Sequence, residues 1–452
     1  MFSKMRFKYF GVLAMGILLQ VNPSKAQETL TLQEAIKYAL EHKAEAKTSR
    51  LDVENAQYQI DEVRAGALPQ VSGAGSLTYN PMLQKVALPG DLMGRPGETL
   101  LVAMGQKWQS DATLTVNQQI FNQALFTGLK AAKSTREFYF INKELTEEQL
   151  IEKVANAYYQ VFQSRLQVQT VETNLNNTEK NQKVIQGQVD AGLAKRIDLD
   201  RTTVEVNNLK AQLQQSRNTL SIQENALKFA IGMDIETQIE LPKETFAIDS
   251  RVFENGTPNL TNRTEIQMLE KQTELLELDK KAAVADYYPN LSFTGNLGYL
   301  GMGPSFPIFS KSQGVAWSGF SGIGLNLSIP IFNGGATRAK VNQKDIEIRR
   351  AKADLIDTKL SLQMANDNAR TQVKNSLLTI NSNEENVKLA KSVLDDTQNN
   401  YRNGLATLTE LLDAENAYAD AQTNYNTSLL DYKIAEVQLI KANGDLKSLV
   451  NE

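Results

Sequence analysis

The pattern of apolar and polar positions is helical over most of the chain, and it is clearest between Tyr401 and Leu446. Apolar residues there recur at every seventh position, which keeps one side of a helix apolar. These positions are Leu411, Tyr418, Tyr425, Tyr432 and Leu439. Asn403 and Gly404 precede the run, and a glycine there predicts the end of the helix before it. The stretch therefore predicts a hairpin tip followed by one amphipathic helix.

The same arrangement occurs earlier in the chain at a constant offset. Gly192 precedes Gly404 by 212 positions (404 − 192 = 212), and the glycines that end the return helices, Gly232 and Gly444, keep this offset (444 − 232 = 212). Each half has the same predicted order of helix, strand, strand, long helix, tip and return helix. We therefore expect two tandem structural repeats.

The longest helical patterns exceed the size of a globular domain. Residues 124–191 and 336–403 stay helical throughout, which corresponds to about 100 Å at 1.5 Å per residue. The shorter predicted helices could stack end to end to match them: 32–67, 196–231, 263–285 and 407–442. Their narrow apolar seams suit a barrel of helices around water, and a surface-exposed coiled coil is the alternative.

Alternation with a period of two predicts four strands, at 71–79, 111–121, 291–299 and 319–332. The segments 81–106 and 300–318 contain Gly and Pro and are predicted as long loops at one end of the strands. Strands of about ten residues with one apolar face fit an outer-membrane barrel, although a soluble β-sandwich has the same pattern. A closed barrel needs about eight strands, so we infer that three chains would together supply twelve.

The first 26 residues are typical of a secretory signal. A basic start, an apolar run from Tyr9 to Val21 and the small residues Ser24 and Ala26 predict cleavage before Gln27. Without a cysteine the new N-terminus cannot carry a lipid anchor. No later apolar run approaches the roughly 20 residues of a spanning helix. We therefore expect a periplasmic, secreted or outer-membrane protein that is not a lipoprotein.

Composition excludes several functions. Lys and Arg total 48 against 52 Asp and Glu, which leaves no basic face for nucleic acid. The chain has no Cys and one His, His42, so a structural zinc site, a thiol nucleophile and a disulfide framework are excluded. No nucleophile, base and orienting group are arranged as catalysis requires. We expect neither an enzyme nor a cofactor or metal.

Several short motifs, taken in order and in duplicate, carry a family resemblance. They are TLQEAIKYAL near the start, the strand openings ALPQVSG and YYPNLSF, the passage LSIPIFNGG, and the tips VDAGLAKRIDL and YRNGLATLTELLDAENAY. The chain resembles the TolC family of outer-membrane efflux proteins over essentially its whole mature length. The resemblance implies a homotrimer with a 12-stranded β-barrel in the outer membrane and an α-helical barrel across the periplasm.

The resemblance also implies a function and its partners. Such a channel conducts passively, as the outer part of a tripartite efflux or type I secretion system. Energy comes from an inner-membrane pump of the RND, ABC or MFS type, reached through a periplasmic adaptor. A structural or adhesive coiled-coil envelope protein without conduction is the alternative. We expect a first repeat at 27–240, a linker or equatorial segment at 241–261, and a second repeat with an equatorial tail at 262–452.

The resemblance places a gate at the helical tips. Asp198 and Tyr401 match the closing pair, while Glu410 and Asp413 match the acidic ring of the aperture. Ala406 stands where some members carry a locking Arg, so the clasp is expected to be weaker or built differently. Independently of the resemblance, threefold copies of the two acids in a narrow constriction would attract cations.

Exposed apolar residues at the tips predict a contact with the adaptor. Six residues are expected to form it: Gly192, Leu193, Ala194, Gly404, Leu405 and Ala406. An apolar side chain at an exposed turn usually marks an interaction site. For Gly192, Leu193, Gly404 and Leu405, turn chemistry alone is the alternative.

Overall fold

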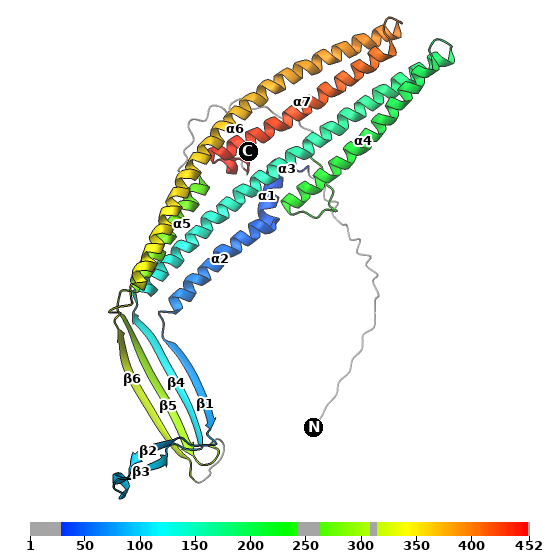
Figure 1. Cartoon of the computed structure of the whole chain (residues 1–452). Coiled ribbons are helices and arrows are strands. Elements are labelled where there is room, and N and C mark those ends of the chain that lie inside the picture. The colour runs from blue at the N-terminus through cyan, green and yellow to red at the C-terminus, as the bar shows by residue number, and fades with distance from the viewer. Residues whose placement is uncertain (1–28, 243–262, 308–313, 451–452) are drawn as a thin grey trace, which may run out of the picture.

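The molecule is a long curved rod with a small sheet at one end and helical tips at the other (Figure 1). The computed structural model describes residues 29–242, 263–307 and 314–450. The expected signal segment and most of the expected linker lie outside these residues. Within them, no helix has an apolar stretch of the length and hydropathy needed to cross a membrane.

Two very long helices form the spine of the rod. Helix α3 (Gln123–Asp190) has 68 residues and α6 (Ala336–Arg402) has 67, so each spans about 100 Å. Two return helices of 36 residues, α4 (Arg196–Ile231) and α7 (Leu408–Asn443), pack back against them. These four helices confirm the predicted lengths to within one residue at each end.

The shorter helices extend the rod toward the sheet. They are α1 (Leu32–His42), α2 (Ala44–Ala65) and α5 (Thr264–Ala285). Thr31 and Glu34 form a capping box at the start of α1. The prediction of one continuous helix over 32–67 was wrong, because Lys43 is extended (φ −65°, ψ 136°). The Lys43 Nζ donates to the Phe229 carbonyl at 2.6 Å and lies over the Phe229 ring, so a contact with α4 fixes this break.

Four antiparallel strands form one sheet in the order β1-β4-β5-β6. Their bounds are β1 (Gln70–Tyr79), β4 (Trp108–Phe121), β5 (Asn290–Gly303) and β6 (Ala316–Ser328). The prediction that the last strand runs to Phe332 was wrong, since it ends at Ser328. Pro330 follows closely and has no N–H to donate to a neighbouring strand.

A small hairpin occupies part of the segment predicted as a loop. Strands β2 (Lys85–Pro89) and β3 (Thr99–Ala103) pair with each other, and the 3-10 helix η1 (Gly90–Met93) connects to β2. The hairpin projects from the end of the sheet farthest from the helices (Figure 1). It was not predicted, because five-residue strands bordered by Pro and Gly resemble turn segments.

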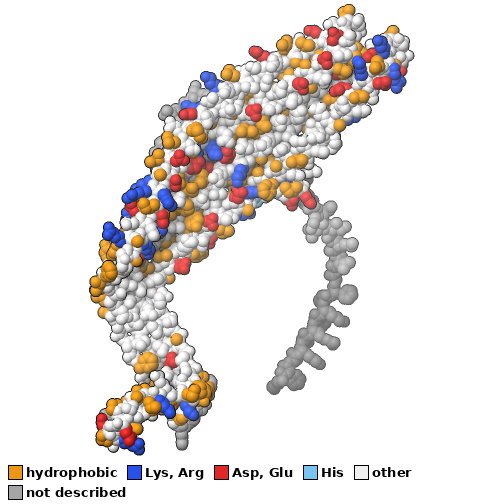
Figure 2. Space-filling model, viewed as in Figure 1, with side chains coloured by type: hydrophobic (Ala, Val, Ile, Leu, Met, Phe, Trp, Pro, Cys, Tyr) orange, Lys and Arg blue, Asp and Glu red, His pale blue; other side chains and the backbone are white. Residues whose placement is uncertain are grey.

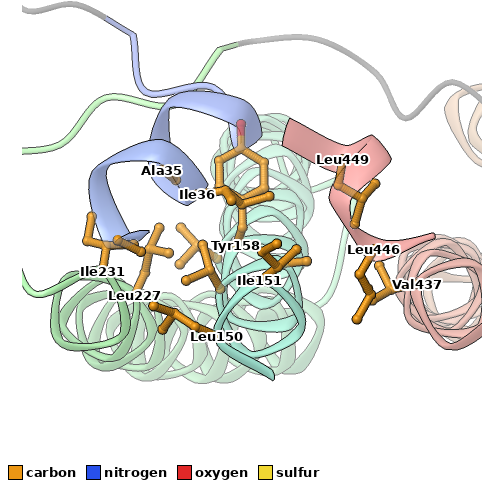
Figure 3. Close-up of a cluster of buried hydrophobic side chains, with 14 of the residues drawn as sticks. Ala35, Ile36, Leu150, Ile151, Tyr158, Leu227, Ile231, Val437, Leu446 and Leu449 are labelled. Atoms are coloured by element: carbon orange, nitrogen blue, oxygen red, sulfur yellow. The ribbon is translucent and has the colours of Figure 1, made fainter. Parts of the chain in front are cut away.

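The main apolar core lies halfway along the rod. Ile36 of α1, Ile151 of α3 and Leu227 of α4 meet there, and Leu449 of the short C-terminal helix η4 (Leu446–Val450) closes one side (Figure 3). Smaller clusters follow the predicted seven-residue seams toward the tips. One cluster joins α3 to α4 and contains Val171, Leu175, Val206, Leu209 and Leu213. In Figure 2, charged side chains gather over the helices and few appear on the sheet.

Candidate functional site

Both helical tips have the same backbone geometry. Gly192 (φ +74°) ends α3 and Gly404 (φ +71°) ends α6, each in the left-handed conformation that glycine adopts without strain. The Leu193 N–H donates to the Gln188 carbonyl at 2.7 Å, and the Leu405 N–H donates to the Asn400 carbonyl at 2.8 Å. This bonding satisfies the last carbonyls of each helix. The two tips lie together at the far end of the rod (Figure 1).

The leucines at these tips receive little cover from the described residues. Leu193 is 81% exposed and Leu405 is 78% exposed. In this type of helix end, the residue at that position usually packs back onto the last turn. Ala194 and Ala406, one position further, are half-buried. The two leucines are therefore free to contact another molecule.

The first turns of the return helices carry acids at equivalent positions, but these acids have different partners. Thr407 and Glu410 form a capping box at the start of α7, and a Glu410 carboxylate oxygen accepts the Thr407 N–H at 2.6 Å. Bonding to the Thr407 backbone lowers the pKa of Glu410. Lys195 makes no side-chain cap at the start of α4, so Asp198 keeps its carboxylate free of a helix cap.

The structure brings Asp198 and Tyr401 into electrostatic reach. Both side chains are half-buried, and burial followed by the Asp198 charge raises the pKa of the Tyr401 phenol. No hydrogen bond joins them within the described part of the chain. Glu410 and Asp413 are exposed on α7. The structure thus groups the four predicted gate residues near one end of the rod.

An apolar cluster joins all four long helices beside the tips. It contains Ile185 of α3, Leu199 of α4, Leu394 of α6, and Leu408, Leu411 and Ala414 of α7, with Tyr401 packed against it. Ile185 and Leu411 are almost fully buried. This cluster fixes the two tips relative to each other.

A half-buried carboxyl next to this cluster was not predicted from the sequence. Glu415 follows Ala414 on α7, and its carboxyl accepts hydrogen bonds from Thr178 and Asn181 of α3. Burial raises the pKa of Glu415. A glutamate in the helical pattern of α7 is usually solvated, so the pattern gave no reason to select it.

Comparisons with known proteins agree with this architecture. A family model described as Outer membrane efflux protein matches residues 35–233 and 259–445. The antibiotic efflux pump outer membrane protein ArpC of Pseudomonas putida is 24% identical over 441 residues, which cover 91% of this chain and 82% of ArpC. The outer membrane protein TolC of Vibrio cholerae is 22% identical over 392 residues, covering 86% of this chain and 84% of TolC.

A solved structure shares the fold. The outer membrane protein VceC of Vibrio cholerae superposes with a TM-score of 0.72 at 20% identity. The match covers 91% of this chain and 96% of VceC.

Proposed function

Because this chain belongs to the outer membrane efflux protein family, we propose that three copies assemble into a channel that carries substrates from the periplasmic side to the outside. Members of this family are outer-membrane channels that extend into the periplasm, and this protein has the same location.

The sheet carries this proposal, because its two faces differ in polarity. One face is largely apolar and contains Val71, Leu77, Leu114, Val116, Phe293, Leu297, Ile323 and Leu325. The other face, apart from Leu300, Met302 and Phe320, consists of small or polar residues such as Ser72, Asp111, Thr113, Thr294, Asn296 and Asn326. Barrel strands in outer membranes alternate in this way between lipid and lumen.

The dimensions and aromatic residues of the sheet support its placement in a bilayer. Strands of 14 and 13 residues, β5 and β6, span about 45 Å, which at a tilt of about 45° crosses a hydrocarbon core of about 30 Å. Tyr79, Trp108, Tyr299 and Trp317 gather on the apolar face at its far end, with ring pairs at 4.5 Å and 5.7 Å. Aromatic residues favour the membrane–water interface.

The open edges of the sheet support closure by several copies. In the described part of the chain, β1 and β6 each pair with one neighbour only. Four strands enclose nothing, and unpaired edges in a lipid core leave polar backbone groups without partners. Three copies would place β6 of one chain beside β1 of the next and complete a 12-stranded barrel. In this proposal, residues 27–240 and 262–452 are the two repeats, and each repeat contributes two strands to the barrel.

The helices would then form a duct of about 100 Å that leads from the barrel to an entrance at the tips. Asp198 and Tyr401 would hold this entrance closed, and Glu410 and Asp413 would line it. The exposed leucines Leu193 and Leu405 would receive a periplasmic adaptor, which links the duct to an inner-membrane pump of an efflux or type I secretion system.

The test is conductance of the purified mature protein in a planar lipid bilayer. Stepwise, cation-selective currents are expected, because the proposed entrance is lined with carboxylates. A protein that inserts into the bilayer but gives no current, in native and gate-opened variants alike, would contradict the proposal.

A further inference from the structure

Glu415 links the two helical hairpins of the chain beside the proposed entrance. The first hairpin consists of α3 and α4, and the second of α6 and α7. Glu415 lies on α7, and both of its hydrogen-bond donors lie on α3. The Thr178 hydroxyl donates at 3.3 Å to one carboxyl oxygen, and the Asn181 amide donates to the other. The carboxyl therefore connects one hairpin to the other.

No positive charge is paired with this carboxyl in the part of the chain that the structure describes. No lysine or arginine of the described residues forms an ion pair with it, although ion pairs are frequent elsewhere on the helices. The charge that acts on it is the carboxylate of Glu205 on α4, which has the same sign. The donor Thr178 is only 3% exposed. Ala414, which precedes Glu415 on α7, belongs to the apolar cluster of Leu411 and Ile185. An ionised Glu415 is thus partly withdrawn from water, and its two hydrogen bonds compensate this only in part because no positive charge is paired with it.

The neutral form fits this position better than the ionised form. A protonated carboxyl can accept the Asn181 amide through its carbonyl oxygen and donate its own proton to the Thr178 hydroxyl. Both links then persist without a buried charge. After ionisation the carboxylate still accepts two bonds, but it is repelled by Glu205 and gains free energy by moving into water.

We propose that Glu415 is a positioning residue that holds the two hairpins together at the entrance when it is neutral and loosens them when it is ionised. This inference rests on the proposed channel function and adds a second, pH-dependent contact to the Asp198 and Tyr401 pair. The entrance would be tighter in acid and looser near neutral pH.

The direction of this pH dependence follows from the linkage between protonation of Glu415 and the tight and loosened arrangements of the hairpins. Burial raises the pKa of Glu415 in the tight arrangement, whereas in a loosened arrangement the carboxyl would be hydrated with an ordinary pKa. The tight arrangement is therefore favoured fully below the ordinary pKa. This advantage is lost as pH rises through the raised pKa.

Spin labels on the two hairpins test this directly, because the chain contains no cysteine that would need to be removed. Lys183 of α3 and Asn416 of α7 are exposed and can each be replaced by Cys. Labelled full-length mature chains are mixed with an excess of unlabelled chains. Most labelled assemblies then contain a single labelled copy, and the measured distances lie within one chain. Distances between the labels are then measured at about pH 5 and about pH 8.

We expect the long-distance population to increase about threefold or more from the acid to the neutral sample. Glu415→Gln keeps both hydrogen bonds and is neutral at every pH, so it should retain the acid distribution throughout. Glu205→Gln removes the repulsion and should move the transition to lower pH. Asp420→Asn changes an exposed acid on the same helix and should behave like the native chain.

A pH-independent distance in the native chain, or an unchanged shift in Glu415→Gln, would overturn the inference. Equal melting temperatures of the native and Gln variants would establish that folding is intact. Conductance of the same samples separates the two proposals. Conducting pores without a pH-dependent distance would contradict the role of Glu415 alone, whereas a pH-dependent distance without conducting pores would contradict the channel.

Discussion

The phenol of Tyr401 and the carboxylate of Asp198 come within electrostatic reach of each other across the two tips. Burial and this negative charge both raise the pKa of the phenol, so the hydroxyl remains protonated and available as a donor. Asp198 is free to act on it because its helix, unlike α7, has no acidic capping box. A motion that separates the two tips would therefore weaken this electrostatic interaction.

Removal of this contact should open the entrance. The double variant Tyr401→Phe with Asp198→Ala loses an interaction of about 1 kcal/mol per copy, which lowers the ratio of closed to open tips about fivefold for each copy. Single-channel recording should therefore detect higher conductance or longer open times. Tyr425→Phe removes a half-buried phenol farther along α7 and serves as the matched control. Equal recordings for all three proteins would place closure in other contacts.

The two acids proposed to line the aperture should differ in what their removal does to stability. Glu410→Gln removes the charge but keeps the capping box with Thr407, whereas Glu410→Ala also removes the side-chain acceptor of the Thr407 N–H and leaves only half of the capping box. Asp413→Asn has no such structural cost, since Asp413 is exposed.

Ion selectivity and thermal melting measure these two effects separately. All three variants should lower the preference for cations in reversal-potential measurements, and only Glu410→Ala should also lower the melting temperature. Selectivity that stays at the native value would exclude these acids from the pore lining.

The two faces of the sheet provide a test with adjacent residues. Leu325 lies on the apolar face and is 66% exposed, while its neighbour Asn326 lies on the polar face. A lysine facing lipid near the bilayer centre costs about 2–4 kcal/mol, whereas a lysine facing a water-filled lumen costs little. Leu325→Lys should therefore reduce the amount of folded protein in outer-membrane fractions, and Asn326→Lys should not. Equal losses in both variants would indicate that neither face contacts lipid.

The exposed tip leucines should affect coupling to partners and leave the pore itself intact. Leu193→Glu combined with Leu405→Glu should abolish crosslinked co-purification of the adaptor from native membranes, because a charge replaces apolar contact area. Ile222→Glu alters an exposed apolar residue on α4, away from the tips, and should leave co-purification unchanged. Retention of the adaptor by the tip variant would assign its contact to another surface. Conductance in bilayers should stay native in both variants.

The periodic parts of the fold were predictable from the sequence. The return helix over Arg196–Ile231 was predicted with the bounds that the structure has, since a long seam and flanking glycines define it. The first strand of each half was also predicted, because alternation of apolar and polar residues over about ten positions is typical of a strand with two different faces. The pairing order and the register of the strands came only from the structure.

Features fixed by distant contacts were not predictable. The break at Lys43 has no local signal, since it depends on a hydrogen bond to Phe229, 186 positions away. Glu415 is also defined by residues of another helix, Thr178 and Asn181, which are more than 200 positions distant. A single sequence contains no record of such pairs, and only the packed structure assigns them.

Closure of the sheet by three copies is the central claim, and cysteine crosslinking between its two edge strands tests it most directly. One cysteine is placed at Gly75 of β1, and a second is placed in turn at positions 320–326 of β6, in a chain without other cysteines. After oxidation in outer membranes, at least one pair should yield a covalent ring of three chains on denaturing gels. If every pair instead gives only unlinked chains or links within a single chain, the edges do not meet between copies and the proposed channel is contradicted.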